Sequence, residues 1–356
     1  MLKKYVLSVK YLLVIIVFSV FLTIIHSNKN FSAGDDDNYL RWAISNKSFL
    51  TIFSPKKAMP MDSYRPVANN LYWLVCLKLF KEKAFFYEIV INLFWLGCMF
   101  FIYKLVTLCK NRTAGFITAI LLMFTPPVQS LLDFFALSTS SIFGFFFTLA
   151  SLFCIIKGLI LNKKKYLVGG ILLAILAILS RESSSYIIGI CVILYIALCH
   201  KHLWQNDIKL LIVFSILCIF SFFLFSKVSN YPAAKNIFLY FGLRIKSYIS
   251  MLTPESFSLV SFIPVFLYGF YRMFQKNTGF LKFSFFWFIF SFIPILFFEL
   301  PRSRYLVEPL APLTIFLSIS LSELIAKKNV SVNILITGAL LLQVYTILNY
   351  TLPVLF

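Results

Sequence analysis

Three consecutive carboxylates stand out in a chain that has few acidic residues. Asp35, Asp36 and Asp37 lie in the stretch Phe31-Ser-Ala-Gly-Asp-Asp-Asp-Asn-Tyr39, and the 356 residues hold only 13 aspartates and glutamates in total. Because adjacent like charges repel one another, such a run of carboxylates indicates a specific role. One interpretation is a general base, or a site for a hard divalent cation such as Mg²⁺ or Mn²⁺. The other is a solvated turn that caps a membrane helix.

Charged residues also lie where the surrounding sequence is apolar. Arg181 and Glu182 sit in Leu179-Ser-Arg-Glu-Ser-Ser-Ser185, between two apolar runs. A charge inside a membrane costs about 2.5–3.5 kcal/mol on insertion scales, so such residues line a cavity or find partners. Two interpretations are open. In one, Arg181 and Glu182 line a cavity. In the other, they pair with one another in a simple outer loop.

A second charged cluster is Glu299-Leu-Pro-Arg302-Ser-Arg304-Tyr305, with Glu308 shortly after it. Guanidinium groups bind phosphate oxygens in bidentate fashion, so Arg302 and Arg304 beside Tyr305 would form a phosphate clamp. The alternative is that these arginines form ion pairs with Glu299 or Glu308.

The composition determines which kind of element must position these residues. With 60% hydrophobic and 19% aromatic residues, the chain is no ordinary soluble domain. Apolar runs recur along the sequence without the two-residue alternation of barrel strands, so we predict an all-α polytopic membrane protein. We expect one transmembrane domain over residues 1–356 and no soluble domain. The seven cysteines lie in or beside apolar runs, which predicts small core residues without disulfides or zinc.

The apolar runs predict about eleven membrane spans, each judged against the roughly 20 residues that cross a bilayer. The predicted spans are Val6–Ile25, Ala84–Val106, Ala114–Leu132, Ala136–Ile156, Tyr166–Leu179, Tyr186–Leu198, Ile208–Phe225, Phe257–Tyr271, Phe283–Leu300, Tyr305–Ile325 and Val330–Leu348.

The chain has a net charge of +20, and the positions of its basic residues predict the orientation of these spans. Its lysines cluster at the ends of apolar runs, which is typical of cytoplasmic loops and argues against nucleic-acid binding. With the N-terminus inside, every short cytoplasmic connection is basic: Lys110/Arg112, Lys163–Lys165, Lys201/Lys209, Arg272/Lys276/Lys282 and Lys327/Lys328. The acidic residues test this model independently, because only Asp207 and Glu323 then fall inside. The other eleven fall on the outer side, namely Asp35, Asp36, Asp37, Asp62, Glu82, Glu88, Asp133, Glu182, Glu255, Glu299 and Glu308.

Two connections are long, and this orientation places both on the outer side. The first, residues 26–83, contains the three aspartates, a Tyr64-Arg-Pro66 element with Arg65 as a further phosphate-binding candidate, and an amphipathic stretch, Val67–Phe80. The second, residues 226–255, carries Arg244 and three lysines among aromatic residues. Cations interleaved with aromatic residues suit a helix in the headgroup plane, or simple interfacial anchors.

Taken together, the outer motifs resemble those of the GT-C class of membrane glycosyltransferases, which use lipid-linked sugar donors. The resemblance is to bacterial relatives of the protein O-mannosyltransferases. Asp36-Asp37-Asn-Tyr, followed by Ile44-Ser-Asn46, is similar to the acidic motif of the first outer loop, and Tyr64-Arg-Pro-Val67 to a Tyr-Arg-Pro-Leu element. Leu179-Ser-Arg-Glu-Ser183 resembles a Ser-Lys-Glu element, and Arg304-Tyr-Leu306 an Arg-Tyr-Leu element. The chain departs from some relatives at Thr125-Pro-Pro-Val-Gln129, which contains no histidine.

The resemblance implies transfer of a sugar from a polyprenyl-phosphate carrier to a glycan, lipid or protein outside a bacterial cytoplasmic membrane. Asp36 or Asp37 would be the base, with Asp35 positioning water, substrate or a divalent cation. Donor-phosphate binding would fall to Arg302 and Arg304, helped by Arg65 and Arg244. Supporting roles would fall to Tyr64, Arg181, Glu182 and Tyr305.

Two other functions remain open from sequence. A transporter or flippase of an anionic lipid or solute would also place charged residues along a path, although no repeated half is evident. An envelope-glycan polymerase would share many spans and outer arginines but would not require the acidic motif.

Overall fold

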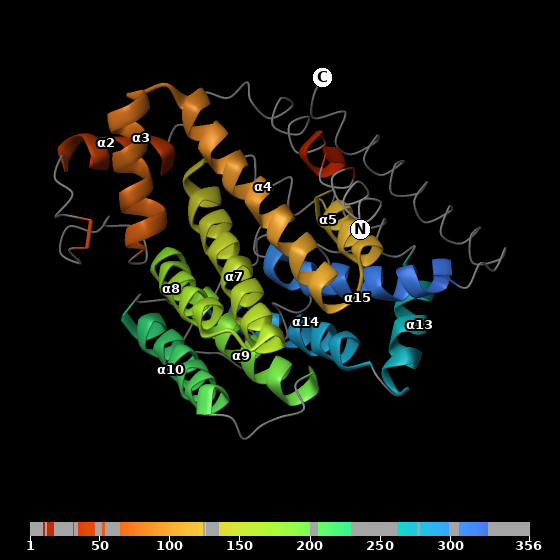
Figure 1. Cartoon of the computed structure of the whole chain (residues 1–356). Helices are drawn as coiled ribbons and strands as arrows, with labels where there is room; N and C mark the ends of the chain where they lie inside the picture. Colours follow the sequence, from red (N-terminus) through yellow and green to blue (C-terminus); the bar gives the residue numbers. More distant parts are fainter. Residues whose placement is uncertain are drawn as a thin grey trace.

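The structure is a computed structural model. It describes residues 10, 13–17, 31, 35–46, 52–53, 65–123, 125, 135–199, 206–228, 262–275, 278–298 and 306–326. Across these residues the regular structure is entirely helical (Figure 1), which confirms the predicted all-α membrane fold.

Twelve helices are described along the chain. They are α2 (Asp35–Ser45), the π-helix η3 (Pro66–Leu71), α3 (Tyr72–Phe80), α4 (Ala84–Cys109), α5 (Arg112–Met123), α7 (Phe135–Leu161), α8 (Lys164–Ser180), α9 (Glu182–Cys199), α10 (Asn206–Val228), α13 (Ile263–Met273), α14 (Gly279–Phe298) and α15 (Val307–Ala326).

Most of the predicted spans coincide with these helices. Among the described residues, four helices are long and apolar enough to cross a membrane: Ala84–Cys109, Thr139–Leu161, Glu182–Cys199 and Val307–Ala326. Shorter apolar helices cover Arg112–Met123 and Gly279–Ile295. The last predicted span, most of the first, and most of the predicted second outer loop lie outside the described residues, so the number of spans stays a prediction.

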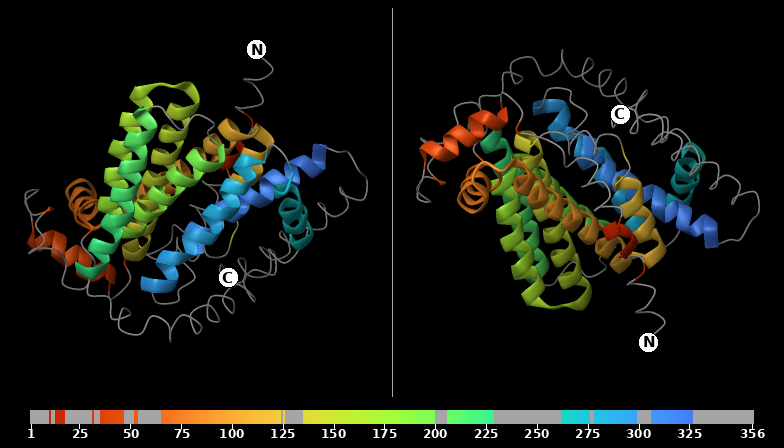
Figure 2. Two further views of the ribbon diagram at one scale, coloured as in Figure 1. Left: turned by 90° about the horizontal axis from the view of Figure 1, so that it is seen from below. Right: turned by 90° about the horizontal axis from the view of Figure 1, so that it is seen from above.

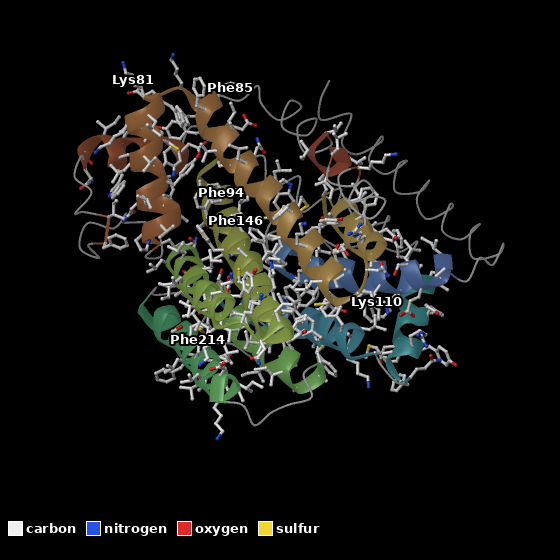
Figure 3. The ribbon with its side chains drawn as sticks, in the orientation of Figure 1. Lys81, Phe85, Phe94, Lys110, Phe146 and Phe214 are labelled. Carbon is white, nitrogen blue, oxygen red and sulfur yellow. The ribbon has the colours of Figure 1, made fainter. Side chains whose placement is uncertain are left out.

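Helices α7, α8, α9 and α10 pack side by side as successive neighbours (Figures 1 and 2). Small residues let these helices approach closely: Ser151 of α7 donates a hydrogen bond to the Gly170 carbonyl of α8, at 2.8 Å. Helix α4 packs against α7 through aromatic rings, with Phe94 and Phe146 edge to face at a centroid distance of 4.9 Å (Figure 3). Helices α5, α13, α14 and α15 form a second group, which contacts the first through α9 and α14 and through α4 and α5.

The described helices of the predicted first outer loop lie together, against the first group. Helices α2 and α3 lie beside the start of α4 (Figure 1), and η3 packs against α7 and α8. The predicted amphipathic stretch Val67–Phe80 is helical throughout, as η3 followed by α3. Its inward side carries Tyr72, Trp73, Leu74 and Cys76, whereas Leu79 is exposed. This unit positions the three aspartates.

Candidate functional site

The three aspartates form the first turn of α2. A helix N-terminus carries partial positive charge, which stabilises carboxylates there. Asp36 faces the interior and is only 1% exposed. Asp37 faces outward, 45% exposed at its side chain, and its carboxylate lies 2.7 Å from the guanidinium of Arg41 one turn later. Helix geometry therefore gives Asp36 and Asp37 different environments.

Aromatic residues form the surroundings of Asp36. Tyr39, one turn after Asp36, stacks on Trp73 of α3 with ring centroids 5.4 Å apart. The Tyr72 hydroxyl donates to the Tyr87 carbonyl at 2.9 Å. Burial raises the pKa of the Tyr72 phenol well above its ordinary value, with smaller contributions from neighbouring groups that include Asp36. Tyr72 therefore remains a neutral donor within electrostatic reach of the Asp36 carboxylate.

Arg65 lies directly before η3 and binds two other helices. Its Nε donates to Glu182 Oε2 at 2.8 Å and its Nη2 to Oε1 at 3.2 Å, which makes the pair bidentate. Its Nη1 donates to Ser140 Oγ of α7 at 3.0 Å. The side chains of Arg65 and Glu182 are 14% and 9% exposed, so the pair is largely shielded from solvent.

Arg181 forms a second ion pair beside the first. Its Nε lies 3.4 Å from Glu308 Oε1 of α15, and its Nη1 donates to Ser141 Oγ at 2.8 Å. Ser183 also donates to Glu308 Oε1, at 3.0 Å. Gly144 of α7 makes room for this arrangement, because a Cβ there would meet the Arg181 Cβ at 2.7 Å.

Arg181 and Glu182 are thus buried at the junction of α8 and α9, with partners on other elements. The interpretation of a simple outer loop is wrong for these two residues. Two arginines and two glutamates make the junction neutral in total charge, and burial favours this balance because an unpaired buried charge is strongly destabilising. The serine partners Ser140 and Ser141 were not predicted from the sequence, although hydroxyl side chains within the apolar run of α7 indicate polar contacts there.

Several predicted site residues lie outside what the structure describes. These are Tyr64, Arg244, Arg302, Arg304 and Tyr305, together with the side chain of Asp35. Among the described residues, no group of three histidine, cysteine, aspartate or glutamate side chains is placed to hold a metal ion. The predicted use of the three aspartates as a cation site therefore stays a prediction.

The chain is similar to a known protein family and to solved structures. Residues 63–225 match the family model described as dolichyl-phosphate-mannose-protein mannosyltransferase. ArnT from Cupriavidus metallidurans in the apo state aligns with a TM-score of 0.58 at 14% identity, over 90% of this chain and 60% of that chain. The Archaeoglobus fulgidus oligosaccharyltransferase tethered with an acceptor peptide aligns with a TM-score of 0.62 at 13% identity, over 96% and 54%. The chain has the GT-C fold.

The GT-C fold and the family segment confirm the resemblance predicted from the sequence motifs. ArnT bound to undecaprenyl phosphate also aligns, with a TM-score of 0.55 at 13% identity over 90% of this chain and 60% of that chain. A comparison with curated protein sequences finds no match. In these structural alignments, the chain spans little more than half the length of the solved GT-C structures that it resembles.

The family segment contains part of the candidate site. Arg65, Arg181 and Glu182 lie within residues 63–225, whereas Asp36 precedes this segment and Glu308 follows it. Ion pairs join Arg65, Arg181, Glu182 and Glu308 at the junction of α8 and α9, and α2, which carries Asp36, packs against α7.

Proposed function

We propose that this protein is a glycosyltransferase of the bacterial cytoplasmic membrane. It moves a sugar from a polyprenyl-phosphate carrier to a hydroxyl of an envelope glycan, lipid or protein on the outer side. The mannosyltransferase-family segment supports the reaction class, and ArnT bound to undecaprenyl phosphate supports the donor class. The observation that carries the proposal is the buried carboxylate of Asp36, on a helix that the Asn69–Tyr39 hydrogen bond joins to η3, which directly follows the ion-paired Arg65.

The transfer reaction requires a base and a cationic group that stabilises the negative charge of the leaving phosphate. The acceptor hydroxyl attacks the anomeric carbon, the bond from that carbon to the carrier phosphate breaks, and the hydroxyl proton moves to a base. We assign the base to Asp36, because Asp37 is exposed and paired with Arg41. Asp35 positions water, substrate or a divalent cation such as Mg²⁺ or Mn²⁺.

The carrier phosphate gains negative charge as the bond breaks. Preorganised cations stabilise such a charge, and the fork of a guanidinium suits phosphate oxygens. We assign this role to Arg302 and Arg304, with Arg244 as a weaker helper. Tyr305 directly follows Arg304, and Tyr64 directly precedes Arg65; we assign a supporting role to both tyrosines.

The proposal is tested by asparagine substitutions in cells that lack the native gene. Asp36→Asn keeps the shape of the side chain but removes its basicity, so transfer should fall by about 10²- to 10⁴-fold. Transfer is measured by mass spectrometry of envelope glycans, and retention of the donor site by binding of undecaprenyl phosphate to the purified protein.

Asp37→Asn is the matched control, since it makes the same chemical change one residue away. It should leave most of the transfer intact, and Asp35→Asn should cause an intermediate loss. Transfer at the wild-type level in all three variants would remove the main physical support for the enzymatic function. Loss in Asp35→Asn or Asp37→Asn alone would move the base to that residue.

A further inference from the structure

The Arg65 guanidinium is held by partners within the protein. Its bidentate pair with Glu182 and its bond to Ser140 direct three of its nitrogens toward α9 and α7. A cation neutralised by a carboxylate at 2.8 Å attracts a phosphate anion less than a free guanidinium does. Arg65 is a phosphate-binding candidate by sequence, but the geometry of its side chain suits a different task.

A continuous set of contacts leads from Arg65 to the helix that carries Asp36. The π-helix η3 begins at the next residue, Pro66, and all residues from Pro66 to Asn70 are buried. Within η3, Asn69 Nδ2 donates to Tyr39 Oη at 3.1 Å. Tyr39 belongs to α2, three residues after Asp36, and is also stacked on Trp73.

The anchor and the carboxylate are therefore joined by rigid elements. Arg65 fixes the start of η3 to α9 and α7, and Asn69 fixes η3 to α2. Asp36 lies in the first turn of the same helix as Tyr39, so a shift of η3 would move the carboxylate. Displacement of a catalytic group by about 1 Å can reduce a rate on the order of a hundredfold.

We propose that Arg65 is a positioning residue, whose ion pair with Glu182 anchors η3 and thereby sets the place of the Asp36 carboxylate. This inference rests on the proposed function for the role of Asp36. The anchoring itself is a property of the loop and can be measured without any transfer reaction.

Two conservative substitutions separate this role from direct binding of the donor phosphate. Arg65→Lys keeps the positive charge but loses the fork, and Glu182→Gln keeps the shape but loses the negative charge. If Arg65 anchors η3, both variants weaken the same contact and change every measurement in the same direction. If Arg65 binds phosphate, the two variants act differently, because Glu182→Gln releases the guanidinium toward the anion.

The first measurement is amide hydrogen exchange of the purified protein. Both variants should speed exchange in residues 36–45 and 66–74 by about two- to thirtyfold, the range typical of substitutions along a coupled network. The second is the dissociation constant for undecaprenyl phosphate, which should stay within about twofold of the wild-type value in both variants. Transfer in cells should fall by about tenfold or more, since a small displacement of a reacting group is sufficient for that loss.

The link between η3 and α2 is tested by a double-mutant cycle. Asn69→Ala removes the donor, and Tyr39→Phe removes the accepting hydroxyl while keeping the ring on Trp73. If the Asn69–Tyr39 bond transmits the anchor, the loss of transfer in the double variant should equal that of either single variant. Additive losses would overturn this link.

Glu323→Gln is the matched control for Glu182→Gln. Glu323 of α15 is also ion-paired and largely buried, but its partners are Lys110 and Arg272 at the other end of the helices. This variant should leave exchange in residues 36–45 and 66–74 unchanged.

Two results would overturn the inference. One is exchange in η3 and α2 that stays at the wild-type rate in both Arg65→Lys and Glu182→Gln. The other is weaker binding of undecaprenyl phosphate in Arg65→Lys together with unchanged or tighter binding in Glu182→Gln. Faster exchange in both variants, combined with normal transfer in Asp36→Asn, would keep the anchor and reject Asp36 as the base.

Discussion

Asp36 and Asp37 show how one step along a helix separates two chemically identical side chains. Successive residues on an α-helix differ by about 100° in direction. Asp36 consequently shares the inward face with Tyr39 and the other buried residues of α2, whereas Asp37 shares the outward face with Arg41. An exposed ion pair of this kind contributes roughly 0–1 kcal/mol, so Arg41 is no strong constraint on Asp37.

At the same scale, the arginines before α15 yield a prediction for donor binding. Arg304→Ala should weaken binding of undecaprenyl phosphate by about tenfold or more, because a hydrogen bond to a charged group contributes about 1.5–3 kcal/mol. Arg304→Lys should restore part of the affinity, since lysine supplies the charge without the planar fork. Unchanged affinity in Arg304→Ala, measured on protein that inserts normally, would make Arg304 a structural residue.

The sequence identified the charged residues of the site but not their pairing. Arg181 and Glu182 were conspicuous because they interrupt apolar runs. The contacts of the site join residues that are distant in the chain. Arg65 lies 117 residues from Glu182, and Ser183 lies 125 residues from Glu308. Local patterns cannot predict such contacts, since they depend on how the helices pack. The burial of Asp36 was likewise unreadable, because it depends on where α3 places Tyr72 and Trp73.

At the scale of elements, apolar length and composition predicted the helices well and their ends less well. The predicted spans Ala84–Val106 and Ile208–Phe225 correspond to α4 and α10, each of which extends a few residues further. The polar residues at these ends belong to the helices because backbone hydrogen bonding continues past the apolar core. The prediction of Tyr186–Leu198 missed that α9 begins at Glu182, where an ion pair stabilises a charge on the first turn.

The contact of α7 with the junction of α8 and α9 yields a prediction for stability. Gly144→Ala should destabilise the protein by about 1–3 kcal/mol, because the new methyl group would overlap Arg181 in a packed site. The measurement is thermal unfolding of the purified protein in detergent. Gly169→Ala is the matched control on α8, where an added Cβ meets nothing within 4 Å, and it should be neutral or slightly stabilising. Equal effects of the two substitutions would show that the fit between α7 and Arg181 is loose.

At the scale of the whole molecule, two groups of ion pairs in the described part of the chain lie at opposite ends of α15. One group joins Arg65, Arg181, Glu182 and Glu308 where α7 and α15 begin. The other joins Lys110 and Arg272 to Glu323 near the ends of α4, α13 and α15.

Lys164 and Asp207 approach one another at 3.9 Å where α8 and α10 begin. The sequence-based orientation assigned Lys110, Lys164, Asp207, Arg272 and Glu323 to the cytoplasmic side. The contacts among these residues agree with a shared side of the membrane.

The orientation itself is the last prediction. Basic short connections favour an inside N-terminus, which places residues 26–83 and 226–255 outside, because translocation of lysine and arginine is disfavoured. Single cysteines introduced into a variant without native cysteines should therefore react with a membrane-impermeant maleimide in intact cells when placed at Ser45 or in residues 226–255. A cysteine at Asn162, in the turn between α7 and α8, should react only after the cells are opened. Labelling at Asn162 alone in intact cells would reverse the orientation, and Asp36 would then face the cytoplasm, away from an acceptor in the envelope.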